Sequence, residues 1–178
     1  MIKELKAISK ARNFRHYSET NWPGLNAVFA STSPARWMDI ARADAAVDAV
    51  EKVYGSIKGY GGLWIAGGWL GGLPYEQSQR KSIVDRFIER GVDESRIIQI
   101  DGKDTVDKVR ELIDVPKIRS GEVKYLGIAS YPLHIARFNL ALQYAQKGWH
   151  VPGLEMIGIP TDYNDRPSSD KKSRPLND

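Results

Sequence analysis

The sequence predicts one α/β domain built on a mostly parallel sheet, and three observations support this. From Leu25 onward, short apolar runs rich in β-formers alternate with stretches of helical periodicity. Turn-forming residues separate the two kinds of segment. Hydrophobic residues make up 42% of the 178 positions and charged residues 27%, as in ordinary globular domains. The predicted architecture is a doubly wound, Rossmann-like three-layer sandwich with a five-stranded, mostly parallel sheet.

The predicted strands and helices alternate in strict order. The first strand follows the turn Trp22-Pro23-Gly24, and Ser31, Thr32, Ser33 and Pro34 then offer caps and a proline for a helix start. Gly91 is expected to end the second helix. The five strands are expected at 25–30, 62–66, 96–100, 123–129 and 154–159. The helices between them are expected at about 35–54, 75–90, 105–113 and 133–147.

Four helical crossovers between parallel strands produce a doubly wound sheet. With strands numbered along the chain, we expect the order 3-2-1-4-5, which places the reversal between strands one and four. The α/β domain is expected to span 21–163. Residues 164–178 lack apolar periodicity and are expected to form a flexible polar tail.

The charge is unevenly distributed along the chain. Residues 1–18 hold five cations and one anion, a net charge of +4 that equals the formal charge of the whole chain. We expect residues 1–20 to form a basic, partly helical arm, and nucleic-acid binding is disfavoured because the rest of the chain is neutral overall. No window approaches the length of a membrane span, and the basic first residues do not resemble a signal peptide. A cytoplasmic location is therefore expected.

Ligands of open parallel sheets bind outside the carboxyl ends of the strands. Here the loops after the strands carry 31–33, then Gly67-Gly68 with Gly71-Gly72, then 101–105, and 130–134. These loops precede helix amino-termini, whose free N–H groups and positive dipole ends favour an anion. The glycine loop matches neither the Walker pattern nor G-x-G-x-x-G, and a flexible turn is an equal alternative.

His134 and Arg137 stand three residues apart at the start of the fourth helix, so their side chains share a face. An imidazole and a guanidinium so placed could hold one anion, and His134 could transfer a proton. The alternative is a capping histidine and a surface arginine. Glu76 faces the glycine loop but could equally form an exposed ion pair with Arg80. Arg42 has the spacing of a surface residue.

Several of these residues together resemble the YdcF-like family, which includes SanA-like and ElyC-like proteins and has been described as a domain of unknown function. The resemblance covers about 25–159. It rests on Arg42, Ala66-Gly67-Gly68, Glu76, Gly91-Val92 with Arg96-Ile97-Ile98, Asp104-Thr105, and the run from Ser130 to Arg137. The family usually has Asn-Thr where this chain has Asp104-Thr105. It also often has a glycine-bearing first loop, where this chain has Ala30-Ser31-Thr32-Ser33.

The resemblance implies one pocket lined by Arg42, Gly67, Gly68, Glu76, Thr105, His134 and Arg137, to which we add Ser130. Arg42 and Arg137 would hold the anion with help from the amides of Gly67 and Gly68. His134 and Glu76 would be the catalytic, proton-transferring residues. Family members are linked to S-adenosylmethionine, which makes that compound a candidate ligand.

The leading hypothesis is binding of an anionic small molecule, phosphate-containing or nucleotide-like, with hydrolase or transferase activity as an extension. The alternative is a non-catalytic ligand sensor or partner-binding module. The sequence has no Gly-x-Ser-x-Gly elbow, no cysteine and no His-Glu-x-x-His pair, so several hydrolase and metal classes are disfavoured. No resident metal is expected, although Mg²⁺ held by Asp101, Asp104 or Glu76 stays an alternative.

Overall fold

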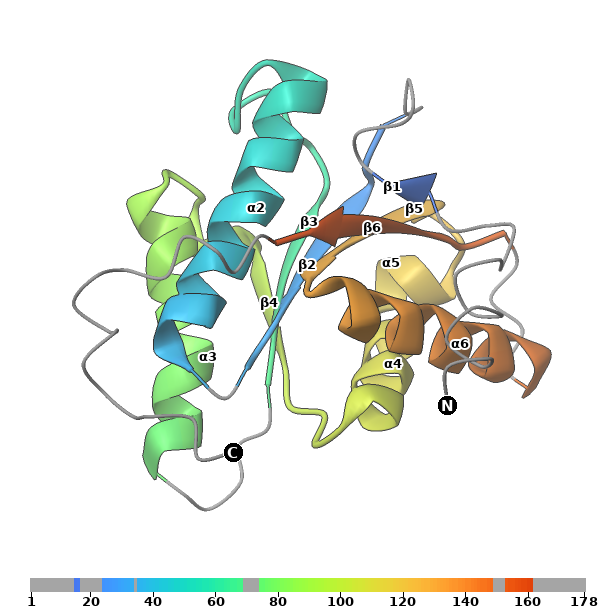
Figure 1. The fold of residues 1–178 in the computed structure, drawn as a ribbon. Helices are drawn as coiled ribbons and strands as arrows, with labels where there is room; N and C mark the ends of the chain where they lie inside the picture. The colour runs from blue at the N-terminus through green and yellow to red at the C-terminus, as the bar shows by residue number, and fades with distance from the viewer. Residues whose placement is uncertain (1–14, 17–23, 34, 69–73, 149–152, 162–178) are drawn as a thin grey trace.

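The computed structural model describes residues 15–16, 24–33, 35–68, 74–148 and 153–161 (Figure 1). Its strands form one parallel sheet in the order β1-β6-β5-β2-β3-β4. The strands are β1 (Arg15–His16), β2 (Ala27–Ser31), β3 (Leu63–Gly67), β4 (Ile97–Ile100), β5 (Tyr125–Ser130) and β6 (Glu155–Pro160). The helices are α2 (Arg36–Tyr54), α3 (Pro74–Glu89), the 3-10 turn η2 (Glu94–Arg96), α4 (Thr105–Asp114), α5 (Pro116–Arg119) and α6 (Pro132–Gly148).

The predicted fold class is confirmed, and so is the predicted strand order. The five expected strands are β2 to β6, and their spatial order β4-β3-β2-β5-β6 is the predicted 3-2-1-4-5. The strand β1 was not expected from the sequence; it extends the sheet by pairing Arg15 with Ile157 and His16 with Gly158. A two-residue strand in a basic segment has no apolar alternation that could reveal it.

Helices cover both faces of the sheet (Figure 1). α2 and α3 pack on one face, where Trp64 and Phe87 belong to one buried cluster with the alanines and valines of α2. α4, α5 and α6 cover the other face, where Phe29 and Phe138 meet edge to face at 5.5 Å between ring centroids. Since the central strands are buried on both faces, they read in the sequence as continuous apolar runs.

The predicted helix boundaries hold to within a residue or two, with two differences. The serines and threonine at 31–33 do not cap α2, whose N-cap is Ala35 without a side-chain hydrogen bond. Ser33 instead turns back to contact the buried side chain of Asp39. A short helix, α5, follows α4 and was not predicted. The expected end of α3 is confirmed, because Gly91 has a φ of 94° and the Val92 N–H donates to the Phe87 carbonyl.

The pairing register brings the carboxyl ends of neighbouring strands into line. Ser31 pairs with Gly67, Gly67 pairs with Ile100, and Ser130 pairs with Pro160. The loops that follow β2 to β6 therefore leave the sheet at one edge, which we call the carboxyl edge. The expected tail at 164–178 and residues 1–14 and 17–20 of the expected basic arm lie outside the described residues. None of the described helices is long and apolar enough to cross a bilayer.

Candidate functional site at the carboxyl edge

Polar side chains are buried where β2, β5 and β6 end. Ser31 and Ser130 are fully buried, and Thr32, Ser33 and Thr161 are at most 9% exposed. Buried hydroxyl groups need partners, since an unpaired one costs about 1–3 kcal/mol. The carboxyl edge therefore holds a group of buried polar side chains, at the end of the sheet where ligands of this fold bind.

Arg42 projects from α2 onto the end of β2 and is only 3% exposed. Its Nη1 donates to the carbonyls of Ser31 and Thr32 at 2.7 and 2.8 Å. The surface position that its spacing predicted is wrong. The reason is that these carbonyls lie at the end of β2 and take their donor from the guanidinium. Arg42 fixes the first loop and places a permanent positive charge under it.

Lys108 reaches the same loop from α4 on the opposite face and is 7% exposed. Its Nζ lies 3.4 Å from Ser31 Oγ and 3.4 Å from Thr32 Oγ1. Burial lowers the pKa of Lys108 to about 8, and the charge of Arg42 acts in the same direction. Lys108 was not among the site residues expected from the sequence.

Asp39 lies in the first turn of α2 and is fully buried. Its Oδ1 accepts the Ser33 N–H at 2.6 Å and lies 2.8 Å from Ser33 Oγ. Its Oδ2 is buried with no hydrogen-bond partner among the described residues. Burial raises the pKa of Asp39 to about 7, against the lowering effects of Ser33, Arg42 and Lys108. This carboxyl group is therefore close to half-protonated at neutral pH.

His134 bridges two hydroxyl groups at the start of α6. Its Nδ1 lies 2.9 Å from Ser130 Oγ, and its Nε2 lies 3.3 Å from Thr105 Oγ1. Hydroxyl groups donate or accept, so either neutral tautomer is satisfied. Burial, together with the positive charges of Arg42, Lys108 and Arg137, lowers the pKa of His134 to about 3. The imidazole is neutral at physiological pH.

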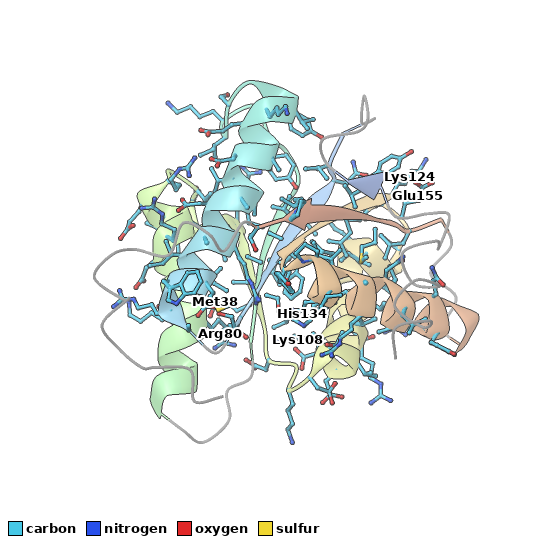
Figure 2. The ribbon with its side chains drawn as sticks, in the orientation of Figure 1. Met38, Arg80, Lys108, Lys124, His134 and Glu155 are labelled. Carbon is cyan, nitrogen blue, oxygen red and sulfur yellow. The ribbon has the colours of Figure 1, made fainter. Side chains whose placement is uncertain are left out.

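Figure 2 shows Lys108 and His134 close together at this edge. Arg137 is exposed one turn beyond His134. The site residues predicted on α2, α4 and α6 therefore come together with Ser130. The cations Arg42, Lys108 and Arg137 all act on one neutral imidazole. Such a concentration of positive charge in a partly dehydrated place favours an anion.

Gly67 and Gly68, which were expected to offer their amides to an anion, lie in close contact with side chains of β2 and the loop after it. A Cβ at Gly68 would overlap the side chain of Thr32, and one at Gly67 would overlap the ring of Phe29. The Gly68 N–H donates to the Ile100 carbonyl at 3.1 Å. Hence these glycines let β2 and β3 end side by side, and the Gly68 amide is engaged within the sheet. Residues 69–73 of the glycine loop lie outside the described residues.

Glu76 is in α3, and its side chain lies outside what the structure describes. Its suggested partner Arg80 forms an ion pair with Asp101, which joins α3 to the loop after β4. Asp104 is the N-cap of α4, accepting the N–H groups of Val106 and Asp107 at 2.8 and 3.0 Å. The described residues contain no group of three or more histidine and carboxylate side chains placed to hold a metal ion.

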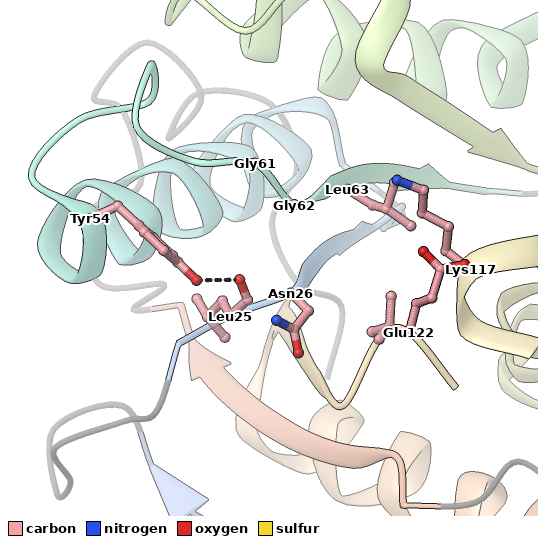
Figure 3. Close-up of a pocket in the computed structure, with 9 residues that line it drawn as sticks. Leu25, Asn26, Tyr54, Gly61, Gly62, Leu63, Lys117 and Glu122 are labelled. Carbon is pink, nitrogen blue, oxygen red and sulfur yellow. Dashed lines mark hydrogen bonds between the residues drawn. The ribbon is translucent and has the colours of Figure 1, made fainter. Parts of the chain in front are cut away.

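A separate pocket of about 270 Å³ lies at the opposite, amino ends of the strands (Figure 3). Its charged side chains, Lys117 and Glu122, are exposed and opposite in sign. Tyr54 closes one side by donating to the Leu25 carbonyl at 2.7 Å. This pocket lacks the buried ionisable groups of the carboxyl edge, which we therefore take as the candidate site. Its lining residues are Leu25, Asn26, Tyr54, Gly61, Gly62, Leu63, Lys117, Glu122 and Val123.

Sequence reasoning missed Asp39 and Lys108. Each carried one available signal. Asp39 stands three residues before Arg42, on the same side of the helix. Lys108 adjoins Val109 and stands four residues before Leu112, so it falls on the apolar face of an amphipathic helix. A charged residue on a buried face is rare unless it has a partner.

The fold and this edge define an α/β protein with an all-parallel, Rossmann-like sheet and a cluster of ionisable groups at the carboxyl ends of its strands. The chain matches no protein-family model, no curated protein and no solved structure.

Proposed function

We propose that the carboxyl edge binds an anionic small molecule, phosphate-containing or nucleotide-like. One observation carries this proposal: the positive charges of the cluster are not balanced by a carboxylate. Arg42, Lys108 and Arg137 all lower the pKa of the neutral His134. The buried carboxyl group of Asp39 has a raised pKa and so favours its uncharged form. An excess of buried positive charge is costly in an empty site. An anion would compensate it, and the hydroxyl groups of 31–33, Thr105 and Ser130 would supply hydrogen bonds.

The resemblance to the YdcF-like family supports the same class of ligand, and it rests on the sequence alone. S-adenosylmethionine, the ligand that the resemblance suggests, has a net positive charge and only one carboxylate. The cations of this edge favour a phosphate over that compound. The cytoplasmic location expected from the sequence stays a prediction.

A thermal-shift panel of nucleotides, sugar phosphates and S-adenosylmethionine tests the proposal, because a ligand that binds only the folded state raises the apparent stability. We expect a phosphate-bearing compound to raise Tm in the native chain. The matched pair is Lys108→Met at the carboxyl edge and Lys117→Met at the amino-end pocket. The first variant should lose the ligand-induced shift and the second should keep it. The opposite pattern would move the site to the pocket of Figure 3.

Binding without turnover is the second candidate function, and the state of His134 favours it. A histidine with a pKa of about 3 is a weak base at neutral pH, and both of its nitrogens already lie against hydroxyl groups. A sensor would bind the ligand unchanged. Turnover of a phosphate ester that disappears in His134→Ala, with binding retained, would instead establish a hydrolase or transferase with His134 as a catalytic residue.

A further inference from the structure

Two helices on opposite faces of the sheet bring ionisable groups to the loop 31–33. Arg42 and Asp39 come from α2, and Lys108 comes from α4. Arg42 holds the carbonyls of this loop, Lys108 lies against two of its hydroxyl groups, and Asp39 holds its last amide. Arg42 and Lys108 contact Ser31 and Thr32, and Asp39 contacts the adjoining Ser33, so the charge of each group acts on the others.

The surroundings of the Asp39 carboxyl group favour its protonated form. One carboxyl oxygen is occupied by Ser33, and the other is buried without a partner among the described residues. An ionised carboxylate in that position would leave a charged oxygen without hydrogen bonds, which is strongly unfavourable. A proton on Oδ2 removes the charge. Burial accordingly raises the pKa of Asp39 to about 7, although Ser33, Arg42 and Lys108 all favour ionisation.

The charged form of Lys108 is also disfavoured by its surroundings. It is a buried amine beside the permanent charge of Arg42, and the two hydroxyl oxygens near it are at the outer limit of hydrogen-bond distance. Burial and Arg42 lower the pKa of Lys108 to about 8, while Asp39 and the N-cap carboxylate Asp104 act in the opposite direction. His134 does not contribute a proton in this range, since its pKa is about 3.

We propose that the proton occupancy of Asp39 and Lys108 sets the anion affinity of the carboxyl edge. The inference rests on the proposed function, since it concerns the regulation of that same site. With both groups protonated, the edge has the charges of Arg42 and Lys108 and no buried anion. Loss of the Asp39 proton adds a negative charge, and loss of the Lys108 proton removes a positive one. Both steps weaken binding of an anion as the pH rises.

Sulfate is the probe for this test, because its charge does not change between about pH 6 and pH 9, whereas phosphate titrates there. The dissociation constant is measured by amide chemical-shift titration at several pH values. In the native chain we expect it to increase at least about tenfold across this range, a typical coupling between interacting sites. The increase should occur in two steps, near the pKa values of the two groups.

Two variants separate the steps. Asp39→Asn should remove the step near neutral pH and keep binding tight until Lys108 loses its proton. Lys108→Met should weaken binding throughout and remove the upper step. Asp48→Asn, on the exposed side of α2, is the matched control and should reproduce the native profile. An apolar methionine in place of a buried amine removes a desolvated charge, so this variant is expected to fold.

The outcomes distinguish the inference from the proposed function. Sulfate binding at this edge with a dissociation constant that does not depend on pH overturns the inference and leaves the anion site standing. The same holds if Asp39→Asn and Lys108→Met both retain the full native profile. Sulfate that shifts no amide of the edge at any pH overturns both. The ¹³C resonance of the Asp39 carboxyl in the ligand-free chain adds a direct check: a midpoint near 7 supports the inference, and one near 4 contradicts it.

Discussion

Ser130 Oγ lies 2.9 Å from Nδ1 of His134, which ties the last residue of β5 to the first turn of α6. The other ring nitrogen lies 3.3 Å from Thr105 Oγ1 in α4, so one imidazole connects a strand end with two helices. A neutral histidine satisfied on both sides is a rigid part of the site. It holds the hydroxyl groups at fixed positions around the carboxyl edge.

Ser130→Ala should destabilise the fold. The substitution leaves a nitrogen of His134 without its partner in a largely buried place, and such a group costs about 1–3 kcal/mol. The measurement is the free energy of unfolding in urea. Ser120→Ala, at an exposed serine after α5, is the control and should change that free energy by less than about 0.5 kcal/mol. Equal effects in the two variants would mean that the contact between Ser130 and His134 does not contribute to the free energy of unfolding.

Gly68→Ala should also destabilise the fold, because the added methyl group would overlap the side chain of Thr32. Overpacking of this kind costs about 1–3 kcal/mol. Gly61→Ala is the control, since a Cβ at Gly61 meets nothing within 4 Å. Thermal unfolding of the two variants should show a lower Tm for the first and an unchanged or slightly higher Tm for the second. If both variants melt like the native chain, β2 and β3 do not end in this close contact.

Arg42→Met should cost about 2 kcal/mol of stability, because the carbonyls of Ser31 and Thr32 lose a charged donor in a buried place. Arg36→Met, at the exposed first residue of the same helix, tests for a mere loss of charge. Urea unfolding distinguishes the two. A loss no larger at position 42 than at position 36 would contradict the role of Arg42 as the clamp of the first loop.

Because of the titration of Asp39, the free energy of unfolding of the native chain should fall as the pH rises from about 4 to 7. Its pKa is about 7 in the folded chain and 3.8 without burial, so the unfolded chain loses the proton first and is stabilised in this window. The loss reaches about 4 kcal/mol, at 1.36 kcal/mol for each pH unit between the two values. The free energy of unfolding of Asp39→Asn, minus that of the native chain, should therefore grow from pH 4 to pH 8. A constant difference would show that Asp39 titrates normally.

His134 has the opposite effect over a similar range. Its pKa is about 3 in the folded chain against 6.5 without burial, so the unfolded chain binds the proton first as the pH falls. The contribution of His134 to the free energy of unfolding is complete above about pH 6.5 and is lost as the pH falls toward 3. His134→Gln cannot take up that proton and should lose less stability in acid than the native chain. Identical acid profiles would indicate an exposed, ordinary histidine.

The fold could be predicted from the sequence because its central strands are buried on both faces. The runs around Phe29, Ile65 and Ile128 are apolar without interruption, and only a parallel sheet covered by two helical layers accounts for that. The strand order was expected from the usual order of doubly wound sheets, because the apolar runs themselves do not determine it. The strand β1 could not be predicted, since the short segment Arg15–His16 has no apolar pattern that would reveal a strand.

The position of the candidate site at the carboxyl edge could be predicted from the sequence, but not all of the residues that form it. The loops after the predicted strands put His134, Thr105 and Ser130 at one end of the sheet, because neighbouring parallel strands in register end together. The structure brings these three residues into contact there. Lys108 was missed because a lysine in a helix is ordinarily exposed, and its burial depends on how α4 packs against the end of β2. Spacing alone put Arg42 on the surface for the same reason, and only the resemblance to the YdcF-like family placed it in the pocket. Tertiary packing, which spacing along one helix does not report, decided both positions.

The most direct test of an anion site at the carboxyl edge is an amide chemical-shift titration of the native chain with adenosine monophosphate. We predict saturable shifts at Thr32, Ser33, Gly102, Thr105 and the first turn of α6, with residues around the amino-end pocket unmoved. Shifts confined to Asn26, Gly62 and Val123 would place the ligand in that pocket and contradict the account.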